Sequence, residues 1–215
     1  MSQDLSEVYR HLWAAHEAEA QLDQSLHPRS PDLLFELVVK LHVDASWTVL
    51  DVGCGRGNHA CEIAQRFGCR VKGLEPVESN LELCRSAALE QNISSQVEFV
   101  KGGIQAIPFA ANSFDFIWCR DMLVHIQDLG KSLEECRRVL KPGGVMLVLT
   151  TFGTDLLEPN EKQFFCQSLN LAEDNLCASH MEQAFVQARL QIASNITLGS
   201  ELAEYYEERD GRYSR

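Results

Sequence analysis

Apolar residues follow two different periods along this chain. Short, nearly continuous apolar segments predict strands that are buried on both faces, and they lie at residues 47–52, 70–75, 96–101, 113–118 and 145–151. Segments with apolar residues at helical spacing follow several of these strands, at residues 58–67, 78–91 and 129–139. Strands that alternate with helices in this way predict a mostly parallel sheet with helices on both faces. We therefore expect an α/β fold.

Two helices are predicted ahead of the first strand. Residues 5–24 have an amphipathic pattern that includes Tyr9, and the prolines within residues 27–31 end it. A second helix is predicted at residues 32–41, where leucine and valine recur at helical spacing. We expect residues 1–44 to form a helical lid on the domain that follows.

That domain is expected to span residues 45–215, and its last part carries weaker signals. A helix is predicted at residues 180–189, and the alternating pattern of residues 190–198 predicts a sixth strand. Residues 201–208 have an acidic, helical pattern. No pattern for a further strand follows before the chain stops at Arg215.

Composition limits the classes of function. The 215 residues suffice for one α/β domain with a sizeable core, and 45% hydrophobic and 23% charged residues are ordinary for a globular protein. The net charge of −12 argues against sequence-independent binding to nucleic acid and is compatible with a cationic substrate. No apolar run approaches the ~18 residues of a membrane span. We expect a small-molecule substrate, without nucleic acid or membrane as partner.

The cysteines indicate a reducing compartment. The chain has eight of them, none in a C-x-x-C pair and several within apolar segments. They predict reduced, mostly buried thiols and no metal cluster. The polar, acidic N-terminus does not resemble a signal peptide, so we expect a cytoplasmic protein. The sequence leaves the oligomeric state open.

The strongest local signal lies at the end of the first predicted strand. Gly53, Gly55 and Gly57 alternate with other residues there, and glycines let the backbone turn sharply and approach a ligand closely. The helix that follows points its free N–H groups toward the same place. Asp51 ends the first strand, and the second ends in Glu75, whose carboxylate can accept both hydroxyls of a ribose. The pattern predicts a ligand that contains a nucleoside.

The spacing of the glycines separates two kinds of loop. A dinucleotide-binding loop has the spacing G-x-G-x-x-G, whereas this chain has G-x-G-x-G. The region 45–152 resembles the class I methyltransferases that use S-adenosylmethionine (SAM), whose motif I has this spacing after an acidic residue. The resemblance implies a Rossmann-like fold, SAM as cofactor and S-adenosylhomocysteine (SAH) as product. The alternatives are a nucleotide-dependent oxidoreductase, which the spacing opposes, and a glycine-rich turn without a ligand.

The resemblance also implies roles for single residues around the cofactor. Asp51 and the three glycines would form the cofactor loop, and Glu75 would bind the ribose. Gly103 stands where the family commonly has an aspartate that binds the adenine amino group, so that bond would come from the backbone or elsewhere. Ile104 fits the apolar residue that packs on the adenine face.

The end of the fourth predicted strand is implied to contact the other half of SAM. Cys119 is placed to offer its backbone carbonyl to the methionine amino group. Arg120 would contact the cofactor or pair with a nearby acid. The family usually has a seventh, antiparallel strand, and we expect this sheet to lack it.

The next residues bear on the acceptor. Arg120, Asp121 and His125 resemble a segment of phosphoethanolamine N-methyltransferases, with related sequences in glycine, sarcosine and dimethylglycine methyltransferases. In that family the aspartate holds the ammonium and the histidine pairs with a tyrosine of an N-terminal helix, for which Tyr9 is the candidate. The segment is not Asn/Asp-Pro-Pro-Tyr, which excludes the DNA and glutamine methyltransferases.

The expected activity is SAM-dependent methyl transfer to a small molecule, with an amine nitrogen favoured. Asp121 would attract the ammonium, and His125 would accept a proton. The two residues are spaced like neighbours on one helical face, so the alternative is that they form only a hydrogen bond at a helix start. The alternatives are O- or C-methylation of a secondary metabolite and a SAM-binding module without turnover.

Overall fold

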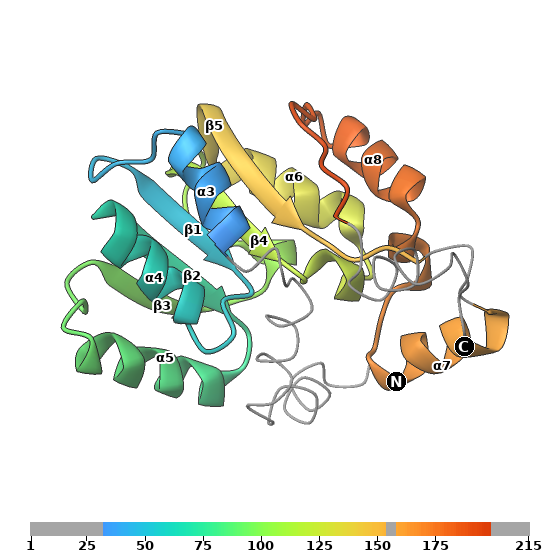
Figure 1. Cartoon of the computed structure of the whole chain (residues 1–215), viewed down its shortest axis with the longest axis horizontal. Coiled ribbons are helices and arrows are strands. Elements are labelled where there is room, and N and C mark those ends of the chain that lie inside the picture. Colours follow the sequence, from blue (N-terminus) through green and yellow to red (C-terminus); the bar gives the residue numbers. More distant parts are fainter. Residues whose placement is uncertain (1–31, 154–157, 199–215) are drawn as a thin grey trace, which may run out of the picture. The chain divides into compact units, whose positions relative to one another are not determined.

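The computed structural model describes residues 32–153 and 158–198 (Figure 1). The chain divides into two compact units, Asp44–Ile192 and the remaining residues on either side. The described part of the second unit contains helix α3, Asp32–Lys40, at the position predicted for a helix. The predicted helix at residues 5–24 lies outside the described residues. The helical lid therefore stays a prediction.

The Asp44–Ile192 unit is built on a five-stranded parallel sheet. Its strands are in the order β3-β2-β1-β4-β5, and every neighbouring pair is parallel. The strands are β1 Thr48–Val52, β2 Arg70–Glu75, β3 Val97–Lys101, β4 Phe114–Arg120 and β5 Leu140–Leu149. The predicted parallel sheet and the positions of its five strands are confirmed.

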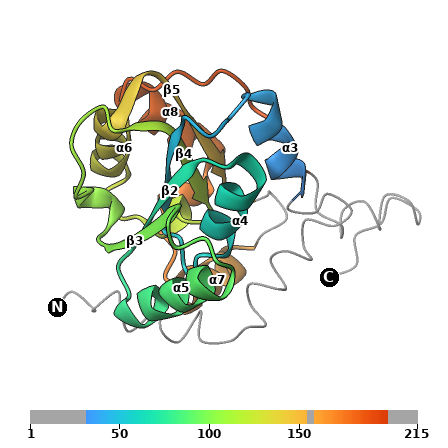
Figure 2. The same cartoon turned by 90° about the vertical axis from the view of Figure 1, so that its left-hand side faces the viewer.

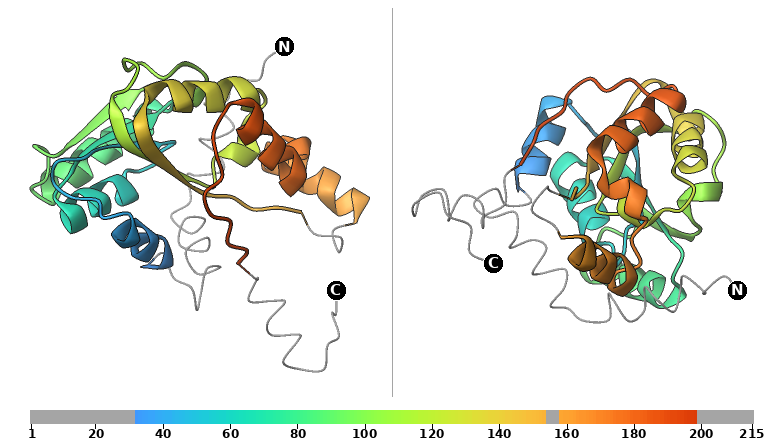
Figure 3. Two further views of the ribbon diagram at one scale, coloured as in Figure 1. Left: turned by 90° about the horizontal axis from the view of Figure 1, so that it is seen from above. Right: turned by 90° about the vertical axis from the view of Figure 1, so that its right-hand side faces the viewer.

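Helices cover both faces of this sheet. Helices α4 and α5 contact β2 and β3, whereas α6 contacts β5 and α8. Figure 2 shows α4 and α6 on opposite sides of the strands, and Figure 3 shows α6 and α8 side by side. The bounds are α4 Asn58–Phe67, α5 Glu78–Glu90, α6 Leu129–Val139, α7 Pro159–Ser168 and α8 Ala178–Gln187, with short 3₁₀ helices η1 Ile104–Ala106, η2 Leu123–His125 and η3 Glu173–Leu176. Of these α-helices, only α7 has no counterpart in the sequence-based prediction.

Alternate side chains of β1 point to opposite faces of the sheet. Leu50 and Val52 are buried in a core cluster with residues of α6 and α8, including Leu133 and Met181. Asp51 lies between them in the strand and therefore points to the opposite face, where it is buried. The apolar alternation of the strand thus places one acidic side chain on the α4 side of the sheet.

Two predictions about strands differ from the structure. The fifth strand was predicted to begin at residue 145, but β5 begins at Leu140 and includes Lys141–Gly144 as a bulge, because Phe114 pairs with Leu140 and Phe116 with Val145. Lys141 Nζ is bound there by Asp115, 2.7 Å from Oδ2. Residues 190–198 were expected as a sixth strand, but they form none. Alternation alone does not make a strand without a partner for its backbone groups, and among the described residues β5 pairs only with β4.

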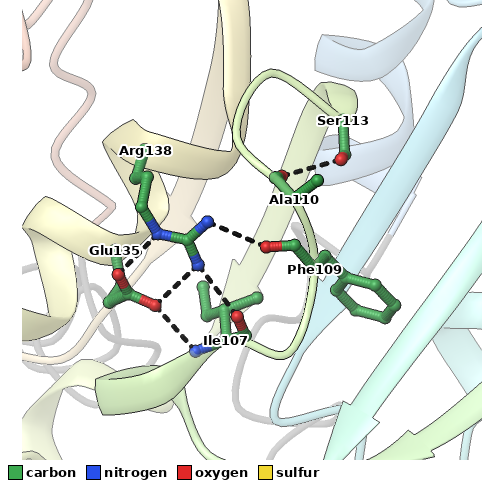
Figure 4. Close-up of polar contacts among 6 residues, drawn as sticks. All are labelled: Ile107, Phe109, Ala110, Ser113, Glu135 and Arg138. Atoms are coloured by element: carbon green, nitrogen blue, oxygen red, sulfur yellow. Dashed lines mark hydrogen bonds and ion pairs between the residues drawn. The ribbon is translucent and has the colours of Figure 1, made fainter.

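A polar cluster joins α6 to the segment after η1 (Figure 4). The Arg138 guanidinium donates to the carbonyls of Ile107 and Phe109, both at 2.8 Å. Glu135 accepts from Arg138 at 2.6 Å and from the Ile107 N–H at 2.9 Å. The hydrogen bond from Arg138 lowers the pKa of Glu135. Two residues one turn apart thus fix the backbone that leads into β4.

Arg138→Met is expected to destabilise the protein by about 1–2 kcal/mol, because it leaves two carbonyls and a carboxylate without their charged donor. The expected loss of stability is small because the Arg138 side chain is 36% exposed and water screens its charge. Urea unfolding measures it. Arg137→Met is the control, since Arg137 is an exposed arginine on the same helix. Equal stability of the two variants would contradict the structural role of the cluster.

All eight cysteines lie in the described residues as free thiols, and six of them are buried. The described part of the chain contains no helix that is both long and apolar enough to cross a membrane. The seventh strand cannot be compared with the structure, because residues 199–215 lie outside the described residues.

Candidate active site

The glycine loop connects β1 to α4 and has a packed side and an open side. Gly55 and Gly57 both have positive φ, +55° and +82°, a conformation that L residues rarely adopt. A Cβ on Gly57 would lie 2.8 Å from the Phe99 ring and 3.0 Å from Cys84 Sγ. A Cβ on Gly55 would have nothing within 4 Å. Gly57 therefore packs against β3 and α5, whereas Gly55 leaves the room that a closely approaching ligand needs.

Two buried thiols lie at the loop: Cys54 belongs to it, and Cys84 contacts it from α5. The Cys84 thiol donates to the Gly55 carbonyl, with 3.2 Å between Sγ and O. A hydrogen bond with Cys84 and burial together raise the pKa of the Cys54 thiol. Cys54 therefore stays protonated near neutral pH and contributes packing rather than a nucleophile.

Glu75, at the end of β2, faces the loop. Its Oε2 accepts the Gly55 N–H at 3.0 Å, and its Oε1 accepts the Val77 N–H at 3.0 Å and the Asn80 amide at 3.2 Å. Burial raises the pKa of Glu75, although these hydrogen bonds oppose the shift. Glu75 is 5% exposed, and the hydrogen bond to its Oε2 holds the carboxylate beside Gly55, the glycine with the open side.

The segment after β3 comes next to Glu75. The Gly102 N–H donates to the Glu75 backbone carbonyl at 3.2 Å. Gly103 begins η1 in an extended conformation, and Ile104 is 2% exposed and belongs to the core cluster. Their proposed contacts with adenine stay predictions.

The end of β4 lies on the side of β1 opposite to β2. Cys119 is fully buried beside Val52, and burial raises the pKa of its thiol. Arg120 Nη1 lies 2.8 Å from His59 Nε2, and Arg120 Nε lies 3.3 Å from Asp121 Oδ2. The predicted alternative in which Arg120 pairs with a nearby acid is therefore confirmed. Its contact with the cofactor stays a prediction.

Asp121 and His125 do not share a helix, so the prediction that they are neighbours on one helical face was wrong. Asp121 has φ +51°, and His125 is the last residue of η2. A residue in the left-handed conformation does not continue a right-handed helix, and the chain bends at Asp121 instead. His125 Nδ1 lies 3.4 Å from the Asn170 carbonyl.

The pH dependence of folding should report on His125. Burial lowers its pKa, so the folded protein keeps the ring neutral while the unfolded chain protonates it below about pH 6.5. Its contribution is therefore present above that pH and is lost as the pH falls, by at most about 1.4 kcal/mol per pH unit. His125→Gln should reduce this slope in urea unfolding between pH 5 and 7, whereas His180→Gln, at an exposed position, should not. Identical slopes in all three proteins would refute the assignment.

Several residues that support the site were missed by sequence-based reasoning. Asn80 binds Glu75, Phe99 packs against the glycine loop, and Asn175 donates to the Leu123 and Ile126 carbonyls that flank His125, both at 2.7 Å. They come from three separate segments, and only the short spacing between Glu75 and Asn80 was visible as a signal. Tyr9, the predicted partner of His125, lies outside the described residues.

The strand order explains why these residues meet. The chain leaves β1 for α4 on one face and β4 for α6 on the other, and ligands of such sheets bind at the carboxyl ends of the strands where the direction of connection changes. The glycine loop, Glu75 and the Arg120–Asp121 pair all lie at these ends. Fold and loop together define a Rossmann-like domain for a nucleoside-containing cofactor, and the G-x-G-x-G spacing is that of the SAM-dependent class.

Comparison with known proteins gives the same class. Residues 50–148 match the family model described as "Methyltransferase domain". The chain is 27% identical over 164 residues to the glycine/sarcosine/dimethylglycine N-methyltransferase of Actinopolyspora halophila, covering 74% of this chain and 29% of that protein. It is 41% identical over 107 residues to a sterol 24-C-methyltransferase of Gibberella zeae, covering 50% of this chain and 28% of that protein. Residues 50–148 therefore match a methyltransferase domain, in agreement with the class that the glycine spacing predicts.

A solved structure supports the fold independently. The geranyl diphosphate C-methyltransferase of Streptomyces coelicolor A3(2), in complex with Mg²⁺, geranyl diphosphate and S-adenosyl-L-homocysteine, superposes with a TM-score of 0.73. The match covers 94% of this chain and 75% of that chain at 22% identity. The predicted Rossmann-like α/β fold is confirmed.

Proposed function

We propose that this protein transfers a methyl group from SAM to a small-molecule acceptor, with an amine nitrogen as the acceptor atom. The observation that carries the proposal is the open side of Gly55, which lies beside the buried carboxylate of Glu75, with Asp121 at the end of the strand on the other side of β1. The first two residues suit a ribose next to a closely approached backbone. Asp121 offers a negatively charged carboxylate, which attracts an ammonium.

Two side chains of this protein would act in the reaction. When bound, SAM supplies a methyl group already activated by its sulfonium, so most catalysis is the holding of the acceptor in line at about 3–3.5 Å. Asp121, whose side chain is 19% exposed, would attract the ammonium. His125 would accept the proton that frees the nitrogen lone pair, because burial lowers its pKa and keeps the ring neutral.

The test combines binding and turnover. Calorimetric titration with SAH should give micromolar affinity, and a panel of primary, secondary and tertiary amines should then yield SAH from SAM with at least one member. Asp121→Asn should raise the KM for that amine at least tenfold, about 1.4 kcal/mol, with little change in SAH affinity. His125→Asn should lower kcat instead. Binding of SAH without turnover of any amine would refute the amine acceptor.

A second candidate is methylation of carbon. It is supported by the identity to the sterol 24-C-methyltransferase, which is 41% over 107 residues, against 27% over 164 residues for the N-methyltransferase. Turnover of an isoprenoid alkene, with no amine accepted, would decide for it. A SAM-binding module without turnover predicts SAH affinity and no product in either panel.

The remaining assignments belong to the same proposal. The eight free thiols support a reducing cytoplasm as the location. The net charge of −12 supports a small-molecule acceptor rather than nucleic acid.

A further inference from the structure

Three side chains connect the start of α4 with the end of β4. His59, the second residue of α4, lies with its Nε2 2.8 Å from Arg120 Nη1. Arg120 Nε lies 3.3 Å from Asp121 Oδ2. We call these three residues the His59–Arg120–Asp121 link. It joins the helix that directly follows the cofactor loop to the carboxylate assigned to the acceptor.

Arg120 is suited to transmit a displacement between the two sides. A guanidinium only donates hydrogen bonds, so His59 Nε2 is the acceptor and the ring proton lies on Nδ1. The Arg120 side chain is 8% exposed. A buried charge costs free energy unless it is paired, so the guanidinium has to follow its partners. Its planar, rigid geometry couples the contact with His59 to the contact with Asp121.

The surroundings limit what can move. The His59 ring packs against Trp118, with ring centroids 5.5 Å apart at 37°, and Trp118 is fully buried in β4. The Asp121 N–H donates to the Leu149 carbonyl at 2.9 Å, and its backbone has φ +51°. The backbone of Asp121 is therefore tied to β5. A shift of α4 would reach the Asp121 carboxylate through its ion pair with Arg120.

We propose that Arg120 is a positioning residue that orients the Asp121 carboxylate according to the state of the cofactor loop. Gly57 is the residue immediately before α4, so a displacement of the loop by the bound cofactor would move His59, and Arg120 would pass that displacement to Asp121. Acceptor binding is thereby favoured once the cofactor is in place. The inference rests on the proposed function in giving Asp121 the acceptor ammonium. It gives Arg120 a different role from the predicted cofactor contact.

The test follows Asp121 itself, with SAH as the probe. The side-chain carboxyl carbon of Asp121 is observed by NMR in protein labelled with ¹³C at aspartate and assigned with Asp121→Asn. Two variants of His59 form a matched pair. His59→Gln keeps a hydrogen-bond acceptor for Arg120, whereas His59→Phe keeps an aromatic ring on Trp118 without an acceptor.

Saturating SAH is expected to shift the Asp121 resonance in the wild type and in His59→Gln. In His59→Phe the same saturation should give less than half of that shift. A wild-type resonance that does not respond to SAH, or an equal response in His59→Phe, would overturn the proposal. A merely structural role of His59 predicts equal responses in every variant that folds and binds SAH.

Kinetics separate the failure of this inference from failure of the amine assignment. Arg120→Lys keeps the positive charge but loses the planar guanidinium and its several N–H donors. It should raise the KM of the accepted amine about tenfold, within the 5–150-fold range typical of coupled sites, while SAH affinity changes little. Weakened SAH binding with an unchanged amine KM would show that Arg120 contacts the cofactor instead. If no amine is turned over but Asp121 responds as expected, the link stands and the amine acceptor is wrong.

Discussion

Replacing Gly57 with alanine is expected to destabilise the protein by about 2–5 kcal/mol. About 1–2 kcal/mol comes from forcing a Cβ into the left-handed conformation at φ +82°. About 1–3 kcal/mol comes from overpacking, because the new Cβ would lie 2.8 Å from the Phe99 ring. The Phe99 ring also packs closely on Gly73, where an added Cβ would lie 2.5 Å from it, so the ring has little room to move away. Urea unfolding of the ligand-free protein measures the loss.

Gly55→Ala is the matched control for this prediction. Gly55 has a similar φ of +55° but nothing within 4 Å of the position of a Cβ. The variant should therefore lose only about 1–2 kcal/mol of stability. Its SAH affinity should nevertheless fall at least tenfold, because the methyl group takes the room that the cofactor needs. A Gly55→Ala protein that binds SAH normally would show that the cofactor does not approach the loop from this side.

Glu75→Gln is expected to weaken SAH binding at least tenfold, about 1.4 kcal/mol, because an amide cannot accept from both ribose hydroxyls. The same substitution should alter the pH dependence of folding. Burial raises the pKa of Glu75, so below its unfolded pKa, about 4.3, the contribution to stability is complete. It is lost as the pH rises through the higher folded pKa, because the folded protein then ionises a buried carboxyl. Glutamine removes that dependence.

The control for Glu75 is Glu78→Gln. Glu78 lies in the first turn of α5, and its side chain is 53% exposed in ion pairs with Arg85 and Lys101. Its replacement should change stability by less than about 0.5 kcal/mol and leave SAH affinity unaltered. Calorimetry with SAH and urea unfolding from pH 4 to 8 measure both effects. Equal SAH affinity in Glu75→Gln and the wild type would remove Glu75 from the cofactor site.

The two predictions separate requirements that coincide in one loop. Gly57 and Phe99 are needed for the loop to pack on the sheet, whereas Gly55 and Glu75 are needed for it to receive a ligand. A buried carboxylate lowers the stability of the ligand-free protein at neutral pH and provides acceptors for the cofactor. The site therefore carries a group that the fold alone would not favour.

The sequence by itself determined the sheet, the glycine loop and the class of cofactor. These depend on local patterns: apolar segments form buried strands, and residues 53–57 bend because glycines repeat at every second position. The acid at the end of β2 was placed by the same logic, since parallel strands end at one edge. The same logic wrongly predicted a strand at residues 190–198, because an alternating pattern without a partner strand does not decide structure.

Only the tertiary structure decided which side chains meet across the sheet. The strand order brings His59 and Arg120, 61 residues apart, within hydrogen-bonding distance. The strand order also places Phe99 against Gly57. The chain bends at Asp121, so Asp121 and His125 do not lie on the one helical face that their spacing predicted. These contacts depend on the packing of strands and helices distant in sequence. Periodicity along the chain carries no information about them.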